Sequence, residues 1–176
     1  NFFFFYDGGN TWQKTSNKNA GGLSFLDQSG WTEVTRMIPH PADKNIALVQ
    51  IGDASLSRTI NGGDTWTYSG NGYRGARVTN RTSYYFDKNI RGKWLYFMVD
   101  RGILITENNG DTWRRMDSLY RTGDGISYET AIVGAVDPKN PNTIIAVLGN
   151  WSHHQYKIVR TTDGGNTWKT VRETLA

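Results

Sequence analysis

Short apolar runs recur along the chain, and a cluster of Gly, Asn, Asp, Pro or Ser residues follows nearly every run. The runs are rich in β-branched and aromatic residues, which favour strands, and they are too short for most helices. We therefore predict strands over 31–38, 46–51, 56–60, 82–86, 94–99, 103–106, 130–136, 143–148, 156–161 and 169–172, with a further strand-like run at 2–6. No stretch shows a clear helical period, so the predicted fold class is all-β.

One phrase occurs four times, at residues 5–12, 59–66, 106–113 and 161–168, and its last copy reads Thr-Thr-Asp-Gly-Gly-Asn-Thr-Trp. The terminal tryptophans lie at 12, 66, 113 and 168, so the intervals are 54, 47 and 55 residues. Repetition at this period predicts one supersecondary unit per repeat. Glycine supplies the positive φ of a tight hairpin, an Asp or Asn side chain accepts backbone hydrogen bonds, and the Trp covers the turn. We interpret these turns as structural, and the residues assigned to them are Asp7, Gly9, Thr11, Trp12, Asn61, Gly63, Thr65, Trp66, Asn108, Gly110, Thr112, Trp113, Asp163, Gly165, Thr167 and Trp168.

The repeated phrase resembles the Asp-box, also called the bacterial neuraminidase repeat. That repeat is found in the β-propellers of sialidases, xyloglucanase-type glycoside hydrolases, sortilin-like receptors and a photosystem II assembly factor. The resemblance implies four-stranded antiparallel blades, each with an Asp-box in the hairpin between its third and fourth strands. The chain departs from the pattern at Asn61 and Asn108, which replace the Asp, and at Phe5, which replaces a Ser or Thr. The same fold serves different functions, so the repeat alone does not choose among them.

The repeat divides residues 1–176 into a half blade over 1–14 and blades over about 31–68, 78–116 and 130–173. A closed propeller has 4–8 blades, and 176 residues are too few at this repeat length. We therefore expect partners in the form of further blades, from the same polypeptide or from another chain.

In the families with this repeat, the repeat turn lies on the face away from the ligand, and the loops between the second and third strands lie on the ligand face. Those loops are predicted at 52–55, 100–102 and 149–155. The third is the longest and carries Trp151, His153 and His154. Residues 135–168 resemble xyloglucanase-type hydrolases most closely, which implies that Trp151 stacks on a sugar ring. The alternative is that Trp151 covers its own blade.

Two carboxylates and one arginine complete the set of candidate site residues. Asp53 and Asp100 occupy equivalent loops, and a pair of carboxylates can act as acid and base in glycoside hydrolysis. The alternative for Asp100 and its neighbour Arg101 is an exposed, ion-paired turn. We include Arg101 among the ligand-binding candidates. Adjacent histidines point apart in an extended chain and no further ligand set is evident, so we expect neither a metal at His153 and His154 nor a cofactor.

Charge and hydropathy exclude two classes of partner. The net charge is +4, with the basic residues scattered, which argues against a nucleic-acid surface. No stretch is long and apolar enough to span a membrane.

A sialidase needs an arginine triad, which Arg77, Arg101 and Arg121 alone do not define.

We expect part of an extracellular or cell-surface propeller that hydrolyses or binds a β-glucan or xyloglucan-like polysaccharide or oligosaccharide. The alternative is a non-catalytic propeller with a structural, assembly or protein-binding role.

Overall fold

A computed structural model describes residues 3–4, 7–14, 34–51, 55–72, 83–116, 130–150 and 155–174. Every regular element in these residues is a strand. The strands form three four-stranded antiparallel sheets and one two-stranded sheet, which confirms the predicted all-β class. The chain divides into two compact units, residues 1–71 and 72–176.

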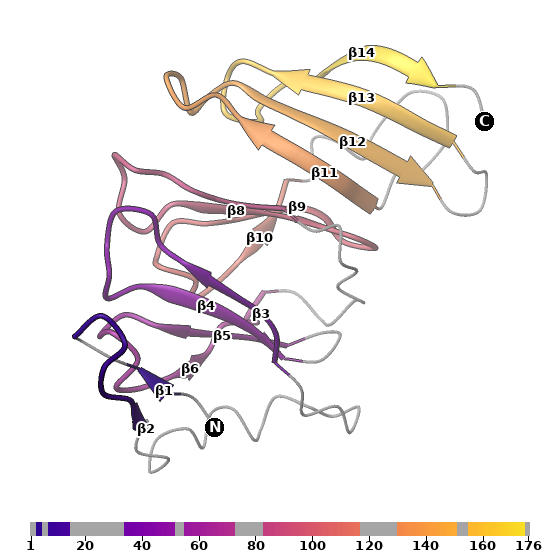
Figure 1. The fold of residues 1–176 in the computed structure, drawn as a ribbon. Coiled ribbons are helices and arrows are strands. Elements are labelled where there is room, and N and C mark those ends of the chain that lie inside the picture. Colours follow the sequence, from indigo (N-terminus) through magenta and orange to yellow (C-terminus); the bar gives the residue numbers. More distant parts are fainter. Residues whose placement is uncertain are drawn as a thin grey trace. The chain divides into compact units, whose positions relative to one another are not determined.

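The first unit holds the two-stranded sheet and one four-stranded sheet. Strands β1 (Phe3–Phe4) and β2 (Gln13–Lys14) pair with each other. The four-stranded sheet follows the chain in simple up-and-down order and is drawn from violet to magenta in Figure 1; its strands are β3 (Val34–Pro39), β4 (Ala47–Ile51), β5 (Ser55–Thr59) and β6 (Thr67–Tyr68).

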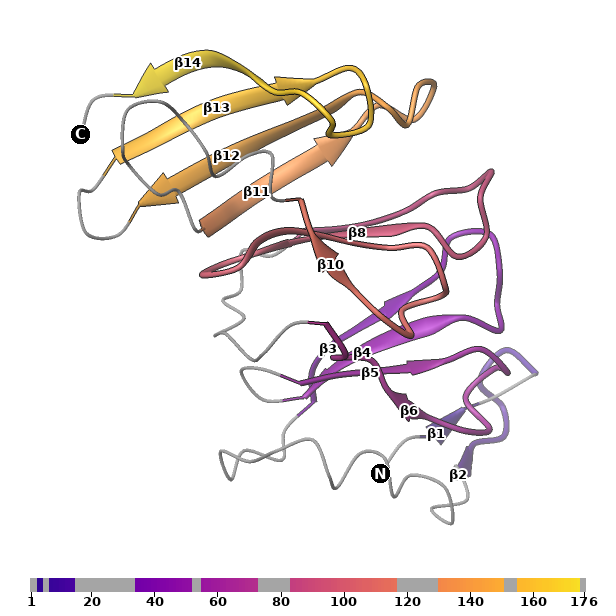
Figure 2. The same cartoon turned by 180° about the vertical axis from the view of Figure 1, so that it is seen from behind.

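The second unit holds two four-stranded sheets of the same up-and-down order. The first sheet comprises β7 (Ser83–Phe86), β8 (Trp94–Met98), β9 (Gly102–Thr106) and β10 (Arg114–Arg115). The second comprises β11 (Thr130–Val136), β12 (Ile144–Asn150), β13 (Gln155–Thr161) and β14 (Lys169–Thr174). Strand β11 packs across β7, β8 and β9, and both views show it beside β8 (Figures 1 and 2).

The core of the second unit lies between its two sheets. Alternation along β12 shows how the sequence builds it, because Ile144, Ala146 and Leu148 are buried whereas Ile145 is exposed. Successive strand residues point to opposite faces, so the buried set belongs to the face that meets the other sheet. The cluster comprises Leu95, Phe97, Ile103, Ile105, Met116, Ala131, Ile144, Ala146, Leu148 and Val159. Full burial of such a Leu, Ile or Phe side chain is worth about 1.5–3 kcal/mol.

The turn after the first strand of each four-stranded sheet is closed by one side chain. Asp87 Oδ1 accepts the backbone N–H groups two and three residues later, at 2.9 and 3.2 Å. Asp137 Oδ1 accepts the N–H two residues later, at 2.8 Å. His40 occupies the equivalent place in the first unit, and its Nδ1 accepts two N–H groups at 3.1 and 3.0 Å. In this turn, a neutral imidazole nitrogen is the hydrogen-bond acceptor in place of a carboxylate oxygen.

The repeat turn after the third strand is closed by a denser network, which the last copy shows completely. The Thr161 hydroxyl accepts the N–H of Gly165 at 3.0 Å and donates to Asp163 Oδ1 at 2.6 Å. Asp163 Oδ1 also accepts the N–H of Thr167 at 3.0 Å. The Trp168 indole N–H donates to the Gly165 carbonyl at 3.1 Å, which holds the ring against its own turn. Each of these contacts joins residues of one turn, so the network stabilises the hairpin locally.

The other copies use the same geometry with different residues. Asn61 Oδ1 and Asn108 Oδ1 each accept the N–H of the Thr four residues later, at 3.0 Å. Their amide groups donate to the hydroxyl of that Thr at 2.8 Å, where an aspartate would accept instead. Asn109 takes the place of a glycine at φ +57°, a conformation that Asn tolerates better than most residues. In the first copy, Asp7 Oδ1 accepts the N–H of Thr11 at 3.0 Å. Trp12 of this copy is 60% exposed.

Candidate functional site

The strand order of the second unit separates two kinds of turn. The repeat turns join β9 to β10 and β13 to β14. The turn between β8 and β9, residues 99–101, lies at the opposite end of β9, because successive strands run antiparallel. The connection between β12 and β13, residues 151–154, occupies the equivalent position in the last sheet. Both connections that carry predicted ligand residues in this unit are therefore at the strand ends away from the repeat turns.

Asp100 is tied to the neighbouring sheet. Its φ is +62°, and its N–H donates to the Thr130 hydroxyl at 3.0 Å. The same hydroxyl lies 3.4 Å from Asp100 Oδ1, where it is placed to donate to the carboxylate. Thr130 is the first residue of β11 and is 1% exposed, whereas Asp100 is partly exposed. A buried hydroxyl thus orients an accessible carboxylate.

Arg101 lies beside Asp100 and is also partly exposed. Its Nη1 is 3.3 Å from the Asp100 carbonyl oxygen, to which it donates. The side chain therefore folds back over the turn, so a cation and a carboxylate are both presented at this edge. A guanidinium offers several N–H donors in one plane, and a carboxylate offers two acceptor oxygens, so the pair suits a ligand rich in hydroxyl groups.

The register of the last sheet links this turn to the longest predicted loop. Thr130 pairs with Gly149 across β11 and β12. Gly149 precedes Asn150, the last residue of β12, after which residues 151–154 begin. The structure thus brings the Asp100 turn and the start of the 151–154 connection to one edge of the second unit.

Several predicted site residues lie outside the described residues. They are Asp53 in the first unit and Trp151, His153 and His154 in the second. Their roles therefore stay predictions, as does the pairing of Asp53 with Asp100. Among the described residues, no group of three or more His, Cys, Asp or Glu side chains is arranged to hold a metal ion. Within the same residues there is no helix long and apolar enough to cross a membrane.

Two of the repeat turns carry a carboxylate whose pKa is lowered. The Thr161 hydroxyl, followed by the hydroxyl and N–H of Thr167, lowers the pKa of Asp163 well below its ordinary value of 3.8. Hydrogen bonds from Thr11 likewise lower the pKa of Asp7. Both carboxylates are held in the charged form by their own turns. A carboxylate held ionised in this way is a poor general acid, which agrees with a structural role.

Sequence reasoning did not identify two polar residues near the Asp100 edge. Thr130 acts across 30 residues of sequence, so no local pattern marks its contact with Asp100. Lys157 is 2% exposed and lies opposite Leu148, one register position from the pair of Thr130 and Gly149. Its burial could have been suspected, because alternation along β13 places Lys157 on the same face as the buried Val159.

Comparisons with known proteins bear on the fold. No protein-family model matches the chain, and no curated protein matches its sequence. Among solved structures, an ancestral GH74 enzyme aligns with 79% of this chain at 18% identity and a TM-score of 0.57. YCF48 from Cyanidioschyzon merolae aligns with 79% of the chain at 22% identity and a TM-score of 0.49. YCF48 bound to D1 peptide aligns with 82% at 18% identity and a TM-score of 0.45.

The chain spans only part of each of these proteins, namely 18% of the GH74 enzyme and 37% and 45% of the two YCF48 chains. At such identities the likeness to the GH74 enzyme concerns the fold. The four-stranded antiparallel sheets of this chain are consistent with blades of a β-propeller like that of GH74 enzymes.

Proposed function

We propose that this chain is part of an extracellular Asp-box β-propeller that binds a β-glucan of the xyloglucan type at the edge formed by the Asp100 turn and the 151–154 connection. The observation that carries the proposal is the link from Asp100 to Thr130 and, through the register, to the strand end that precedes Trp151. The resemblance of residues 135–168 to xyloglucanase-type hydrolases supports the same ligand class.

The chemistry of the edge suits a neutral sugar chain. Arg101 supplies N–H donors and Asp100 supplies carboxylate acceptors, and each can bond to sugar hydroxyls. Trp151 would supply the apolar plane on which a sugar ring stacks. Because Thr130 fixes the backbone of Asp100 from the neighbouring sheet, the carboxylate is held before the ligand arrives. Such preorganisation reduces the entropy lost on binding.

Hydrolysis would need a second carboxylate. An inverting glycosidase places its two carboxyl groups about 6.5–9.5 Å apart, and a retaining enzyme about 5–5.5 Å apart. The 99–101 turn carries one carboxylate, that of Asp100. We therefore propose glycan binding as the first activity, with Asp53 and Asp100 as the residues to test for catalysis.

The test is a calorimetric titration of the protein with xyloglucan and mixed-linkage glucan oligosaccharides. Trp151→Ala and Arg101→Ala should each weaken binding, and the loss of the stacking ring should cost roughly tenfold in Kd, equivalent to about 1.4 kcal/mol. Trp12→Ala serves as the matched control, because this exposed tryptophan lies in a repeat turn, and it should leave affinity unchanged.

A folded protein that gives no heat with either oligosaccharide would overturn the proposal and favour a structural or protein-binding propeller. If binding is found, Asp53→Asn and Asp100→Asn are assayed separately for release of reducing sugar. Full hydrolysis by both variants would exclude these two carboxylates from catalysis.

A further inference from the structure

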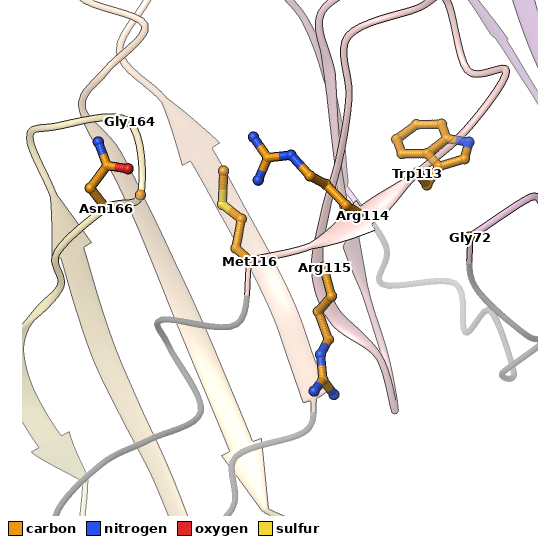
Figure 3. Close-up of a pocket in the computed structure, with 8 residues that line it drawn as sticks. Gly72, Trp113, Arg114, Arg115, Met116, Gly164 and Asn166 are labelled. Atoms are coloured by element: carbon orange, nitrogen blue, oxygen red, sulfur yellow. The ribbon is translucent and has the colours of Figure 1, made fainter.

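A second site lies in the second unit where strand β10, at the edge of its sheet, meets the last repeat turn. There a pocket of about 670 Å³ opens between strand β10 and the last repeat turn. Trp113, Arg114, Arg115 and Met116 line one side, and residues 164–166 line the other (Figure 3). A volume of this size falls within the range of pockets that hold small ligands or a few residues of a peptide.

The pocket carries a positive charge that is only weakly neutralised. Arg114 extends from β10 toward the side of the pocket where Met116 and Asn166 lie (Figure 3). Its Nη2 is 3.6 Å from Glu107 Oε2, and the two side chains are 63% and 61% exposed. An ion pair this long and this exposed contributes little, so a carboxylate from a ligand can replace that of Glu107.

The remaining walls combine a buried thioether with an exposed polar acceptor. Met116 is 4% exposed and packs against the last repeat turn, because a Cβ on Gly165 would lie 3.0 Å from its sulfur. Asn166 Nδ2 donates to the Asp163 carbonyl at 2.8 Å, which fixes the amide. Within the described residues, no hydrogen bond to Asn166 Oδ1 is found, so this exposed oxygen can accept an N–H.

We propose that this pocket binds an acidic segment of a partner protein, in which a Glu or Asp carboxylate pairs with Arg114. In this arrangement a backbone N–H next to the acidic residue donates to Asn166 Oδ1. A glycan fits the pocket less well, because Trp113 is 3% exposed and offers no open ring face for stacking. The site is independent of the glycan proposal, since none of its lining residues belongs to the Asp100 turn or to the 151–154 connection.

The test is fluorescence anisotropy with a labelled, end-blocked peptide of alternating Glu and Leu, titrated with the protein. A peptide with Gln in place of Glu is the matched probe. Arg114→Gln should raise the Kd for the Glu peptide about tenfold, because a charge-assisted contact is lost. Glu107→Gln should lower the Kd, because it removes the competing carboxylate. Arg172→Gln, an exposed arginine on β14, should leave the Kd unchanged.

Three results would overturn the proposal. Equal binding of the Gln and Glu peptides would remove the role of the carboxylate. Equal weakening by Arg172→Gln and Arg114→Gln would indicate a diffuse basic surface rather than a site. Competition by an oligogalacturonate at lower concentration than the Glu peptide would assign the pocket to an acidic sugar. Because Arg114 is exposed, loss of folding is not expected in its variant, and circular dichroism checks this.

Discussion

The ring of Phe97 lies directly against the backbone of Gly134: a Cβ placed on that glycine would fall 2.0 Å from Cε1 of the ring. Phe97 belongs to β8 and Gly134 to β11, so this contact joins the two sheets of the second unit. Phe97 is 0% exposed, which leaves the ring no solvent-filled space into which it can retreat. The absence of a side chain at residue 134 therefore sets how closely the sheets approach.

Gly134→Ala should destabilise the second unit by about 1–3 kcal/mol, the usual cost of overpacking a close-packed core. Urea unfolding of the two proteins measures the difference. Phe97→Leu in the Gly134→Ala background should recover part of the loss, although Phe97→Leu alone should be destabilising. Unchanged stability of Gly134→Ala would contradict the stacking of β11 on β8.

Asp163 should make folding sensitive to acid. Its folded pKa lies below the ordinary 3.8, so its carboxylate favours the folded state above about pH 4, and the contribution is lost as pH falls toward the folded pKa. Asp163→Asn should keep the hydrogen bonds, as Asn61 and Asn108 do, but lose this dependence. The difference in unfolding midpoint between wild type and Asp163→Asn should therefore shrink as pH falls below about 4. A constant difference would refute the role of the charge, and Asp163→Ala should be less stable than Asp163→Asn at neutral pH.

His40 should be replaceable by aspartate but not by alanine. Asp87 and Asp137 close the equivalent turns with a carboxylate oxygen where His40 uses Nδ1. His40→Ala leaves two backbone N–H groups without this acceptor and should cost about 1–3 kcal/mol. His40→Asp should lose clearly less, as thermal unfolding of the three proteins at neutral pH will show. Equal losses for the two variants would mean that packing of the imidazole, rather than turn closure, keeps histidine there.

Thr130 should protect the backbone of Asp100. Its hydroxyl accepts the Asp100 N–H at 3.0 Å, so the Asp100 amide should exchange slowly with deuterium although its side chain is partly exposed. Thr130→Val removes the acceptor at almost constant volume and should speed the exchange of this amide, whereas Thr130→Ser should preserve protection. If Thr130→Val leaves the exchange rate unchanged, the hydroxyl is not what holds the turn.

Local chemistry explains which parts of the fold were predictable from the sequence. The glycines of the repeat turns and the alternation along β12 depend on neighbours in sequence, so the strands and their order could be predicted. No residue pattern near Ala131 and Val133 indicates the β-bulge between them. Strands β6 and β10 are two residues each, and one further backbone hydrogen bond to the third strand follows each of them, from Ser69 to Leu56 and from Met116 to Ile103.

The candidate sites were less predictable because they depend on contacts between sheets. Asp100 and Arg101 could be selected as residues of one loop, but the support from Thr130 comes from a different sheet. The pocket beside Arg114 likewise forms only when residues 164–166 lie opposite β10. Predicting either site from sequence requires the packing of one repeat on the next, which the repeat phrase does not specify.

Amide chemical-shift mapping of the isotopically labelled protein with a xyloglucan oligosaccharide distinguishes directly between binding at the Asp100 edge and binding at the repeat turns. Glycan binding is proposed at the loop end of the sheets, whereas the repeat turns have a structural role. The amides of Asp100, Arg101 and Thr130 should therefore shift on titration, and those of Gly165 and Thr167 should not. Shifts confined to the repeat turns, with none at the Asp100 edge, would contradict glycan binding at that edge.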